Sequence, residues 1–217
     1  MLAPSYDLPF LNRWREAITA QRHILFALLA SFIGYFGPSR LPLREAHEVP
    51  ITPIDRVMPL IPWTVFGYVL LYPFLVLTVL YLVLRPAALR PVAYAIIAAN
   101  LIGGLIFTLY RTTVPRPALA ATGWDAEILR FLWSIDPPYN ALPSLHAAYG
   151  IIIAWGFIKL RSRWTPLVLA CSAIVVFTTL TTHQHRFLDL VGGAILAAAV
   201  CLYFYRRLGP WHDRPHW

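Results

Sequence analysis

Long uninterrupted runs of hydrophobic residues dominate the chain. Six of them stand out, at residues 24–37, 63–84, 91–110, 143–160, 165–182 and 187–205. A helix rises 1.5 Å per residue, so about 20 residues cross a hydrocarbon core of about 30 Å. The second and third runs reach that length, the last three lie near the lower limit, and the first is short enough to be re-entrant. Barrel strands would alternate apolar and polar positions, and these runs do not. The pattern predicts an all-α integral membrane bundle of about six transmembrane helices.

Proline-rich and charged segments separate the runs. The two longest, residues 38–62 and 111–142, are predicted to be loops, and Pro73 is predicted to kink the second run. Asn100 lies inside the third run, where a polar side chain most often forms a hydrogen bond to another helix. We expect one membrane-embedded domain over residues 1–217, with an uncleaved N-terminal anchor at about residues 1–40.

Composition narrows the class of protein further. Hydrophobic residues make up 59% of the chain and charged residues 13%, against about 45–50% and about 25% in soluble domains. These values exclude a soluble domain and a disordered chain. The net charge of +8 comes from scattered arginines rather than from a basic patch, so we expect no nucleic-acid partner. Cys171 and Cys201 both lie in apolar runs and are read as small buried hydrophobic residues.

The distribution of Lys and Arg predicts the orientation. With six spans, the side that holds both termini carries eleven cations, and the opposite side carries seven. The positive-inside rule then places the termini in the cytoplasm and the opposite side in the periplasm or outside the cell. The short loops are typical of a bacterial inner-membrane protein.

Three polar clusters fall on the predicted outer side. They occupy residues 110–117, 139–146 and 182–189. Because successive helices cross a bilayer in opposite directions, the end of the third run, the start of the fourth and the fifth-to-sixth junction share one face. Ionisable groups are costly near lipid, so their gathering at one face indicates a functional site.

The residue types in these clusters suit phosphoryl transfer. His185 and Asp189 are four residues apart, so on a helix the carboxylate would orient the imidazole as a nucleophile. Ser144 stands where a helix N-cap is expected, and the first turn of a helix attracts phosphate. His146 can act as a general acid, and the planar guanidinium of Arg116 can bind two phosphate oxygens. This set of residues requires neither a metal nor a cofactor.

Five further polar residues in the clusters are candidate contacts to the substrate, and four of them have a second interpretation. Arg111 either contacts phosphate or anchors its loop, and Arg186 either contacts phosphate or faces lipid headgroups. His183 either touches the substrate or makes structural hydrogen bonds, and the second reading is favoured. Tyr110 and Asn140 are candidate substrate contacts, although Tyr110 also fits an aromatic belt at the membrane interface.

The clusters resemble the three signature motifs of the type 2 phosphatidic acid phosphatase superfamily, whose members are membrane lipid phosphatases and phosphotransferases. Arg116-Pro117 matches the end of Lys-x6-Arg-Pro, Pro143-Ser144-x-His146 matches Pro-Ser-Gly-His, and His185-x3-Asp189 matches the end of Ser-Arg-x5-His-x3-Asp. The resemblance covers about residues 63–205 and implies a catalytic core there. It implies that His185 forms a phosphohistidine with Asp189 as its orienter, that His146 is the general acid, and that Arg116 and Ser144 bind phosphate.

The chain departs from these motifs at four positions. Leu109 stands at the lysine of the first motif, Leu145 at the glycine of the second, and Thr178 and Thr179 at the Ser-Arg pair of the third. Pro-Ser-Leu-His resembles the inositolphosphotransferase branch, which includes inositol phosphorylceramide synthases. Two cationic phosphate contacts of the phosphatases are absent, and Arg111 and Arg186 are the available replacements.

Three functions remain open on the sequence alone. The first is hydrolysis of a lipid-linked phosphate, such as a phospholipid or a polyprenyl phosphate. The second is transfer of a phospho-headgroup onto a lipid or sugar acceptor, as the resemblance to the inositolphosphotransferase branch suggests. The third is a lipid transporter or scaffold that keeps the fold without catalysis. The partners expected in each case are the bilayer and a lipid phosphate.

Overall fold

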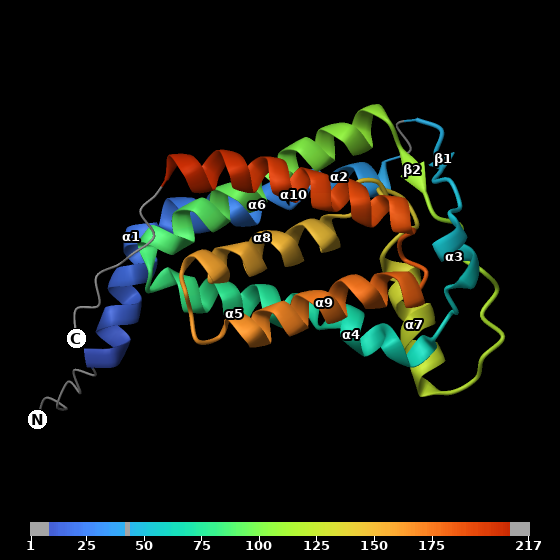
Figure 1. Cartoon of the computed structure of the whole chain (residues 1–217), viewed down its shortest axis with the longest axis horizontal. Coiled ribbons are helices and arrows are strands. Elements are labelled where there is room, and N and C mark those ends of the chain that lie inside the picture. Colours follow the sequence, from blue (N-terminus) through green and yellow to red (C-terminus); the bar gives the residue numbers. More distant parts are fainter. Residues whose placement is uncertain (1–8, 42–43, 209–217) are drawn as a thin grey trace, which may run out of the picture.

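The computed structural model describes residues 9–41 and 44–208, and helices make up most of this part of the chain (Figure 1). The helices are α1 (Pro9–Ser31), α2 (Ile33–Arg40), α3 (Pro53–Val57), the 3-10 helix η1 (Pro62–Thr64), α4 (Val65–Val69), α5 (Leu71–Val83), α6 (Pro86–Leu109), α7 (Trp124–Ile135), α8 (Leu145–Lys159), α9 (Thr165–Thr181) and α10 (Phe187–Arg207). Two short parallel strands, β1 (His47–Glu48) and β2 (Thr112–Thr113), pair with each other. The prediction of an all-α protein is confirmed. Residues 1–8 of the predicted anchor lie outside the described residues, as does Arg214, one of the eleven cations counted above.

Four helical segments within the described residues are long and apolar enough to cross a membrane. They are Phe10–Pro38, Pro62–Val83, Pro86–Leu109 and Phe187–Arg207. Helices α8 and α9 are apolar but shorter, with 15 and 17 residues. These lengths are compatible with an integral membrane protein. They support four of the six predicted spans, and the first of these is considerably longer than the predicted run at 24–37.

The kink predicted for the second run takes the form of a break between α4 and α5. Leu70 separates the two helices, three residues before Pro73. Proline has no N–H to donate, and its ring clashes with the carbonyl four residues earlier, which here is that of Val69. The break therefore falls where the proline removes a hydrogen bond.

Helix α7 lies in a segment that was predicted to be a loop. Its residues Ala126, Leu129 and Leu132 recur every three positions and are buried, and Leu129 and Leu132 pack against Val65 and Tyr68. Acidic residues occupy its first turn, where they stabilise the positive end of the helix. The apolar face is too short to register as a membrane run, which explains why the composition of the segment predicted a loop.

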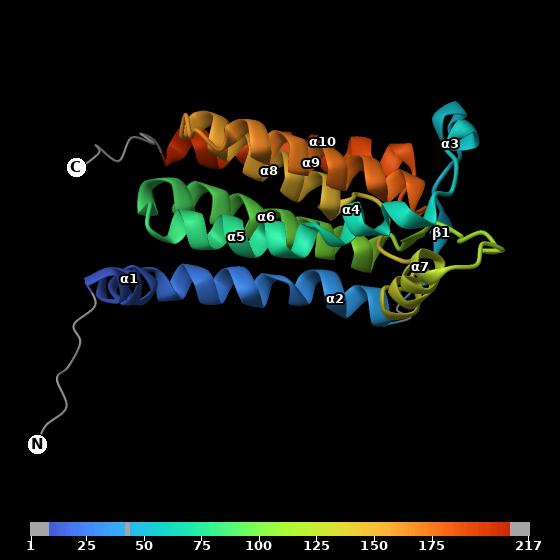
Figure 2. The ribbon, with the colours of Figure 1, turned by 90° about the horizontal axis from the view of Figure 1, so that it is seen from below.

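The helices form three layers (Figure 2). Helices α1 and α2 make one outer layer, α5 and α6 lie in the middle, and α8, α9 and α10 make the other outer layer. Small residues allow the first two layers to approach closely, since a Cβ on Gly104 would lie 2.5 Å from the carbonyl oxygen of Gly34. Asn100 on α6 donates to Ser31 Oγ at 2.7 Å and accepts from Tyr149 Oη at 2.5 Å. The hydrogen bond to another helix predicted for Asn100 is confirmed.

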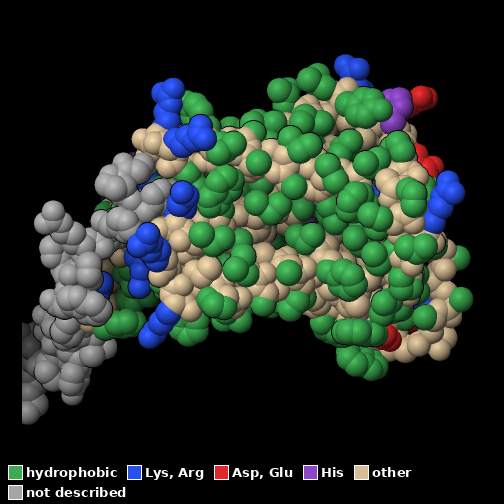
Figure 3. Space-filling model, in the orientation of Figure 1, with side chains coloured by type: hydrophobic (Ala, Val, Ile, Leu, Met, Phe, Trp, Pro, Cys, Tyr) green, Lys and Arg blue, Asp and Glu red, His purple; other side chains and the backbone are tan. Residues whose placement is uncertain are grey.

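Hydrophobic side chains cover the flank of the bundle, and Lys and Arg gather toward its two ends (Figure 3). Leu101 and Leu105 on α6 and Ile195 on α10 are each more than half exposed. A soluble protein would rarely expose so large an apolar surface. In a membrane these side chains face lipid.

One end of the bundle carries most of the irregular structure. Helices α3 and α7 and the two strands lie there, beside the starts of α8 and α10 (Figure 1). The starts of α8 and α10 are joined directly, because the Ser144 N–H donates to the carbonyl oxygen of Asp189 at 2.9 Å. Close packing of α10 on α8 sets the distance between the second and third polar clusters.

Gly193 is the residue that permits this packing. A Cβ at Gly193 would overlap the backbone oxygen of Ser144 and touch Ala147. We expect Gly193→Ala to lower the stability of the protein by about 1–3 kcal/mol through overpacking, measured as a lower midpoint of thermal unfolding in detergent. Gly37→Ala is the matched control, since a Cβ there meets nothing within 4 Å. Equal midpoints for the two variants would contradict the close contact.

Candidate active site

Side-chain and backbone hydrogen bonds tie the three polar clusters together at this end of the bundle. Thr112 Oγ1 accepts from the Leu142 N–H at 2.9 Å, which joins the first cluster to the second. Arg116 Nη2 donates to Gln184 Oε1 at 2.8 Å, which joins the first to the third. The bond between Ser144 and Asp189 joins the second to the third. Segments up to 70 residues apart thus form a single site.

Two buried imidazoles are in contact at the centre of this site. His146, in the first turn of α8, and His185, just before α10, approach with 3.2 Å between His146 Nδ1 and His185 Nε2. Asp189 Oδ2 lies 3.5 Å from His185 Nδ1, which is long for a hydrogen bond but close for a charge. A carboxylate at that position favours the proton on His185 Nδ1, so Nε2 carries the lone pair and His146 Nδ1–H is the donor.

The pairing of His185 with Asp189 has a different origin from the one predicted. The sequence predicted both residues on one helix, four positions apart, but α10 begins at Phe187 and His185 precedes it. Asp189 Oδ2 accepts from the Arg186 N–H at 2.8 Å and so closes the first turn of the helix. That turn folds the chain back and brings His185 toward the carboxylate.

Ser144 is the N-cap of α8, as its position after Pro143 indicated. Its Oγ accepts from the Ala147 N–H at 3.3 Å, and its side chain is completely buried. The cap satisfies one of the free amides of the first turn and fixes where α8 starts. His146 is held in that first turn, next to the positive end of the helix.

The guanidinium of Arg116 is held by its neighbours beside the third cluster. Besides Gln184, it donates to the backbone oxygens of Trp133 and Asp136, each at 2.5 Å. Its Nε is buried and has no hydrogen-bond partner among the described residues. Burial lowers the pKa of Arg116, against the charge of Asp136, which raises it. An arginine remains protonated at neutral pH under such a shift, so the site contains a fixed positive charge.

The other two arginines are engaged with parts of the loops. Arg111 donates to the backbone oxygen of Arg44 at 3.3 Å, and its guanidinium carbon lies 3.7 Å from the centre of the Tyr139 ring. Arg186 donates to the backbone oxygen of Val49 and forms a 2.5 Å ion pair with Glu48. Both arginines thus hold the loop before α3 against the site.

The three candidate substrate contacts lie in different surroundings. Tyr110 is half exposed, and its ring is stacked on His47 with 4.8 Å between ring centres. Asn140 is buried and donates to the backbone oxygen of Tyr35 at 3.0 Å. His183 has a backbone φ of +51°, a left-handed conformation that is uncommon for histidine. Burial lowers the pKa of His183, against a hydrogen bond with the Met58 backbone and the charge of Asp55, which raise it, so this imidazole is neutral at pH 7.

The structure adds an aromatic support for His146 that the sequence did not indicate. The Tyr68 ring packs on the His146 ring with 4.7 Å between centres. Tyr68 Oη donates to Asp136 Oδ2 at 3.0 Å, and Tyr35 Oη donates to Asp136 Oδ1 at 3.2 Å. Asp136 follows α7, so the helix missed from the sequence supplies the carboxylate that positions these tyrosines.

A second addition is Asp55 on α3. Its Oδ1 accepts from the Phe187 N–H at 2.8 Å, and its Oδ2 accepts from Thr52. Burial alone would raise the pKa of Asp55, but these hydrogen bonds and the charge of Arg186 lower it, so the group is a carboxylate at neutral pH. The segment Thr52-Pro53-x-Asp55 is a helix-capping pattern that could have revealed α3 from the sequence.

Two cavities meet at the pair of histidines. His185 lines a small pocket of about 160 Å³ together with Asp55, His183 and Arg186. His146 lines the end of a much larger groove of about 580 Å³, whose walls are almost entirely apolar. The two imidazoles therefore line different cavities: a small pocket of mixed polar and apolar lining, and an apolar groove.

Buried polar atoms without a hydrogen-bond partner concentrate in the site. Of nine such side-chain atoms in the described part of the chain, seven belong to the three polar clusters: Arg111 Nε, Arg116 Nε, Asn140 Oδ1, His183 Nε2, Gln184 Nε2, His185 Nδ1 and Asp189 Oδ1. Native proteins rarely leave such groups unsatisfied, and exceptions often mark functional sites. Within residues 9–41 and 44–208, no group of three or more His, Cys, Asp or Glu side chains is arranged to hold a metal ion.

The apolar helical bundle thus holds a buried His–His–Asp arrangement at one end, with Arg116 bonded to Gln184, the residue before His185. Residues 54–203 match the family model of the PAP2 superfamily. That match spans well over half of the chain, and the chain therefore belongs to the PAP2 superfamily, whose members are phosphatases and phosphotransferases. A search of curated proteins found none that matches this sequence.

Proposed function

We propose that this protein hydrolyses a lipid-linked phosphate, such as a phospholipid or a polyprenyl phosphate, through a phosphohistidine at His185. The observation that carries the proposal is the 3.2 Å contact between His146 Nδ1 and His185 Nε2, with Asp189 behind His185. The lone pair of His185 Nε2 points at the N–H of His146. A phosphate that enters between the two imidazoles therefore meets a nucleophile on one side and a proton donor on the other. The entering group replaces the hydrogen bond between the two imidazoles with its own contacts.

In the first step His185 Nε2 attacks phosphorus, and the bond from phosphorus to the lipid oxygen breaks. His146 donates its Nδ1 proton to that departing oxygen, and Asp189 stabilises the imidazole as it gains positive charge. In-line transfer requires the nucleophile and the leaving oxygen on opposite sides of phosphorus. The two imidazoles face each other and line different cavities, which supports this division of roles.

In the second step water attacks the phosphohistidine, and His146 removes its proton. Phosphate leaves His185, and both imidazoles return to their starting protonation states. Arg116 is proposed to stabilise the charge on the phosphoryl oxygens, because its guanidinium is fixed before substrate binds and its Nε is free. Ser144 contributes by fixing the first turn of α8, whose amides attract phosphate.

Transfer to an alcohol acceptor is the second candidate function. The small pocket beside His185 supports it, because Asp55, His183 and Arg186 offer polar groups to a hydroxylated headgroup or acceptor within its volume of about 160 Å³. An acceptor hydroxyl would then replace water in the second step. For either function we propose that the site opens at the outer face of a bacterial inner membrane. The chain ends leave the described bundle at the end opposite to the site (Figure 1), as the predicted orientation requires.

One experiment separates the two candidates. Purified protein in nanodiscs is incubated with phosphatidic acid, polyprenyl phosphate and phosphatidylinositol, each with and without added inositol. We expect free inorganic phosphate from the monoester lipids and no effect of inositol. Inositol phosphate that forms from a monoester lipid only when inositol is present would establish transfer to an alcohol instead. No product from any substrate would contradict both.

A further inference from the structure

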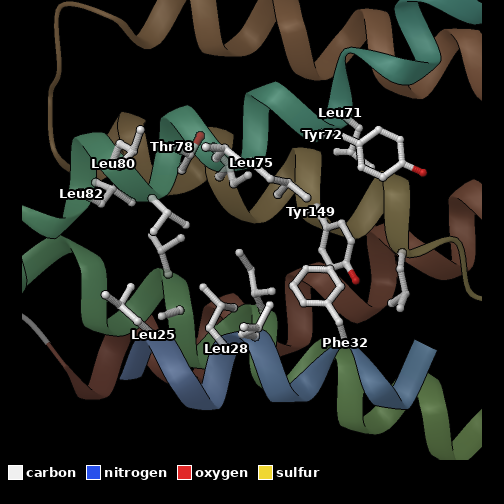
Figure 4. A pocket seen from close by; sticks show the side chains of 18 of the residues that line it. Leu25, Leu28, Phe32, Leu71, Tyr72, Leu75, Thr78, Leu80, Leu82 and Tyr149 are labelled. Carbon is white, nitrogen blue, oxygen red and sulfur yellow. The ribbon is translucent and has the colours of Figure 1, made fainter. Parts of the chain in front are cut away.

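The large groove has no role in the steps described so far. It lies between helices α1 and α2 on one side and α5 on the other, with α6 and α8 at its floor (Figure 4). Helix α1 packs mainly against α6, which leaves a gap toward α5. The volume of about 580 Å³ is within the range of about 300–1,000 Å³ that is usual for ligand pockets.

The groove begins at the catalytic end and runs along the bundle. His146 and Tyr149 line it at that end, and Leu25 and Leu82 line it far from the site. On α5 its lining extends from Leu71 to Leu82, and the eleven helical steps between these residues correspond to about 16 Å. That length is close to half of a hydrocarbon core of about 30 Å, or the depth of one leaflet.

The lining excludes a polar occupant. It contains no Lys, Arg, Asp or Glu, and His146 is the only titratable group other than tyrosines. The side of the groove is open, since Leu29 and Val76 line it and are 73% and 59% exposed. A lipid chain in the surrounding bilayer can therefore enter sideways without passing through water.

We propose that this groove binds a hydrocarbon chain of the substrate lipid while the phosphate lies between His146 and His185. The inference rests on the proposed function and specifies where the apolar part of the substrate goes. His146, the group proposed to protonate the departing lipid oxygen, is the residue that lines the groove. The lipid part of the substrate thus departs on the side where its chain is held.

The wall formed by α1 and α2 lies outside the matched family region. That match begins at residue 54, and both helices precede it. Leu28 and Phe32 supply part of this wall opposite Leu75 and Val79 of α5. Helices α1 and α2 therefore convert a lipid-facing side of the catalytic core into a groove of limited length.

The first test is photolabelling of the unaltered protein in nanodiscs. The probe is dodecyl phosphate with a diazirine at the far end of its chain. We expect labelling of groove residues on α1 and α5, with a large excess over the lipid-facing Leu101 and Leu105, and competition by unlabelled dodecyl phosphate. Labelling confined to lipid-facing residues, or spread evenly over the bundle, would overturn the proposal.

The second test fills the groove. We expect Val79→Trp to lower kcat/KM for dodecyl phosphate at least about tenfold, because a pocket discriminates chains by fit, while ethyl phosphate is hydrolysed as before. Leu101→Trp, on the lipid-facing side of α6, should change neither. Unchanged dodecyl phosphate hydrolysis in Val79→Trp would overturn the proposal. If hydrolysis of both phosphates falls equally, the substitution has damaged the fold. The photolabelling of the unaltered protein then decides whether the groove binds the chain.

Failure of the groove and failure of the proposed function give different results. Photolabelling requires binding but no turnover. Labelled groove residues without phosphate release would therefore support the lipid-binding groove and contradict the proposed phosphatase activity. Phosphate release with labelling outside the groove would support the phosphatase activity and contradict binding of the chain in the groove.

Discussion

Replacing His185 with glutamine is expected to abolish phosphate release, with a loss of at least about 10³-fold in kcat, because it removes the group proposed to form the covalent intermediate. Glutamine keeps a polar side chain of similar size, so the buried site remains filled. The measurement is release of inorganic phosphate from the best substrate of the lipid panel. In parallel, radiolabelled substrate should leave acid-labile phosphate on the unaltered protein and none on the variant.

His23→Gln is the matched control for this substitution, since His23 is an exposed histidine on α1, far from the clusters. It should retain full activity and normal labelling. Undiminished turnover in His185→Gln would contradict the phosphohistidine and favour a transporter or scaffold that does no chemistry. Lost turnover with persistent acid-labile labelling would assign the nucleophile to another residue.

The second large effect is expected for His146→Gln, and it should depend on the leaving group. For an alkyl phosphate, loss of a general acid lowers kcat by about 10²–10⁴-fold. For nitrophenyl phosphate the departing phenolate needs no proton, so we expect the first step, followed as the initial burst of nitrophenolate, to remain within about tenfold of the unaltered protein. The second step should slow for either substrate, because His146 is also its general base. The measurement is the ratio of the two rates in each protein.

This ratio separates chemistry from structural damage. Tyr68 packs on His146, so a disturbed fold would lower both rates together. Tyr68→Phe is the informative companion, because it keeps the ring on His146 and removes only the hydrogen bond to Asp136. Equal losses for both substrates in the rate of the first step of His146→Gln would contradict its role as general acid.

The sequence predicted the elements that depend on local pattern. Long apolar runs gave the positions of α5, α6, α8, α9 and α10, because burial in lipid or in a helical core demands uninterrupted hydrophobic residues. The N-cap at Ser144 and the interruption near Pro73 followed from the hydrogen-bonding properties of serine and proline. Helix α7 was missed because its apolar face is only a few residues long, and α3 was missed because it has five residues, none of them buried.

The chemistry of the site was visible in the residue types, but the roles of the arginines were not. The types and order of the His, Asp and Arg residues indicated phosphoryl transfer before any contact was known. Which group each arginine side chain contacts depends on partners that lie far away in the chain. Arg116 reaches Gln184, whereas Arg186, although adjacent to His185, turns to Glu48.

The sequence by itself determined an all-α, strongly apolar chain with three polar clusters, because hydrophobic period and residue chemistry are local properties. The tertiary structure alone decided that His146 and His185 touch, that Asp136 and Tyr68 support them, and that α1 and α2 close a groove along α5. These features arise from packing between helices, which depends on the shapes of side chains distant in sequence, such as Gly193 beneath Ser144 and Gly34 beside Gly104.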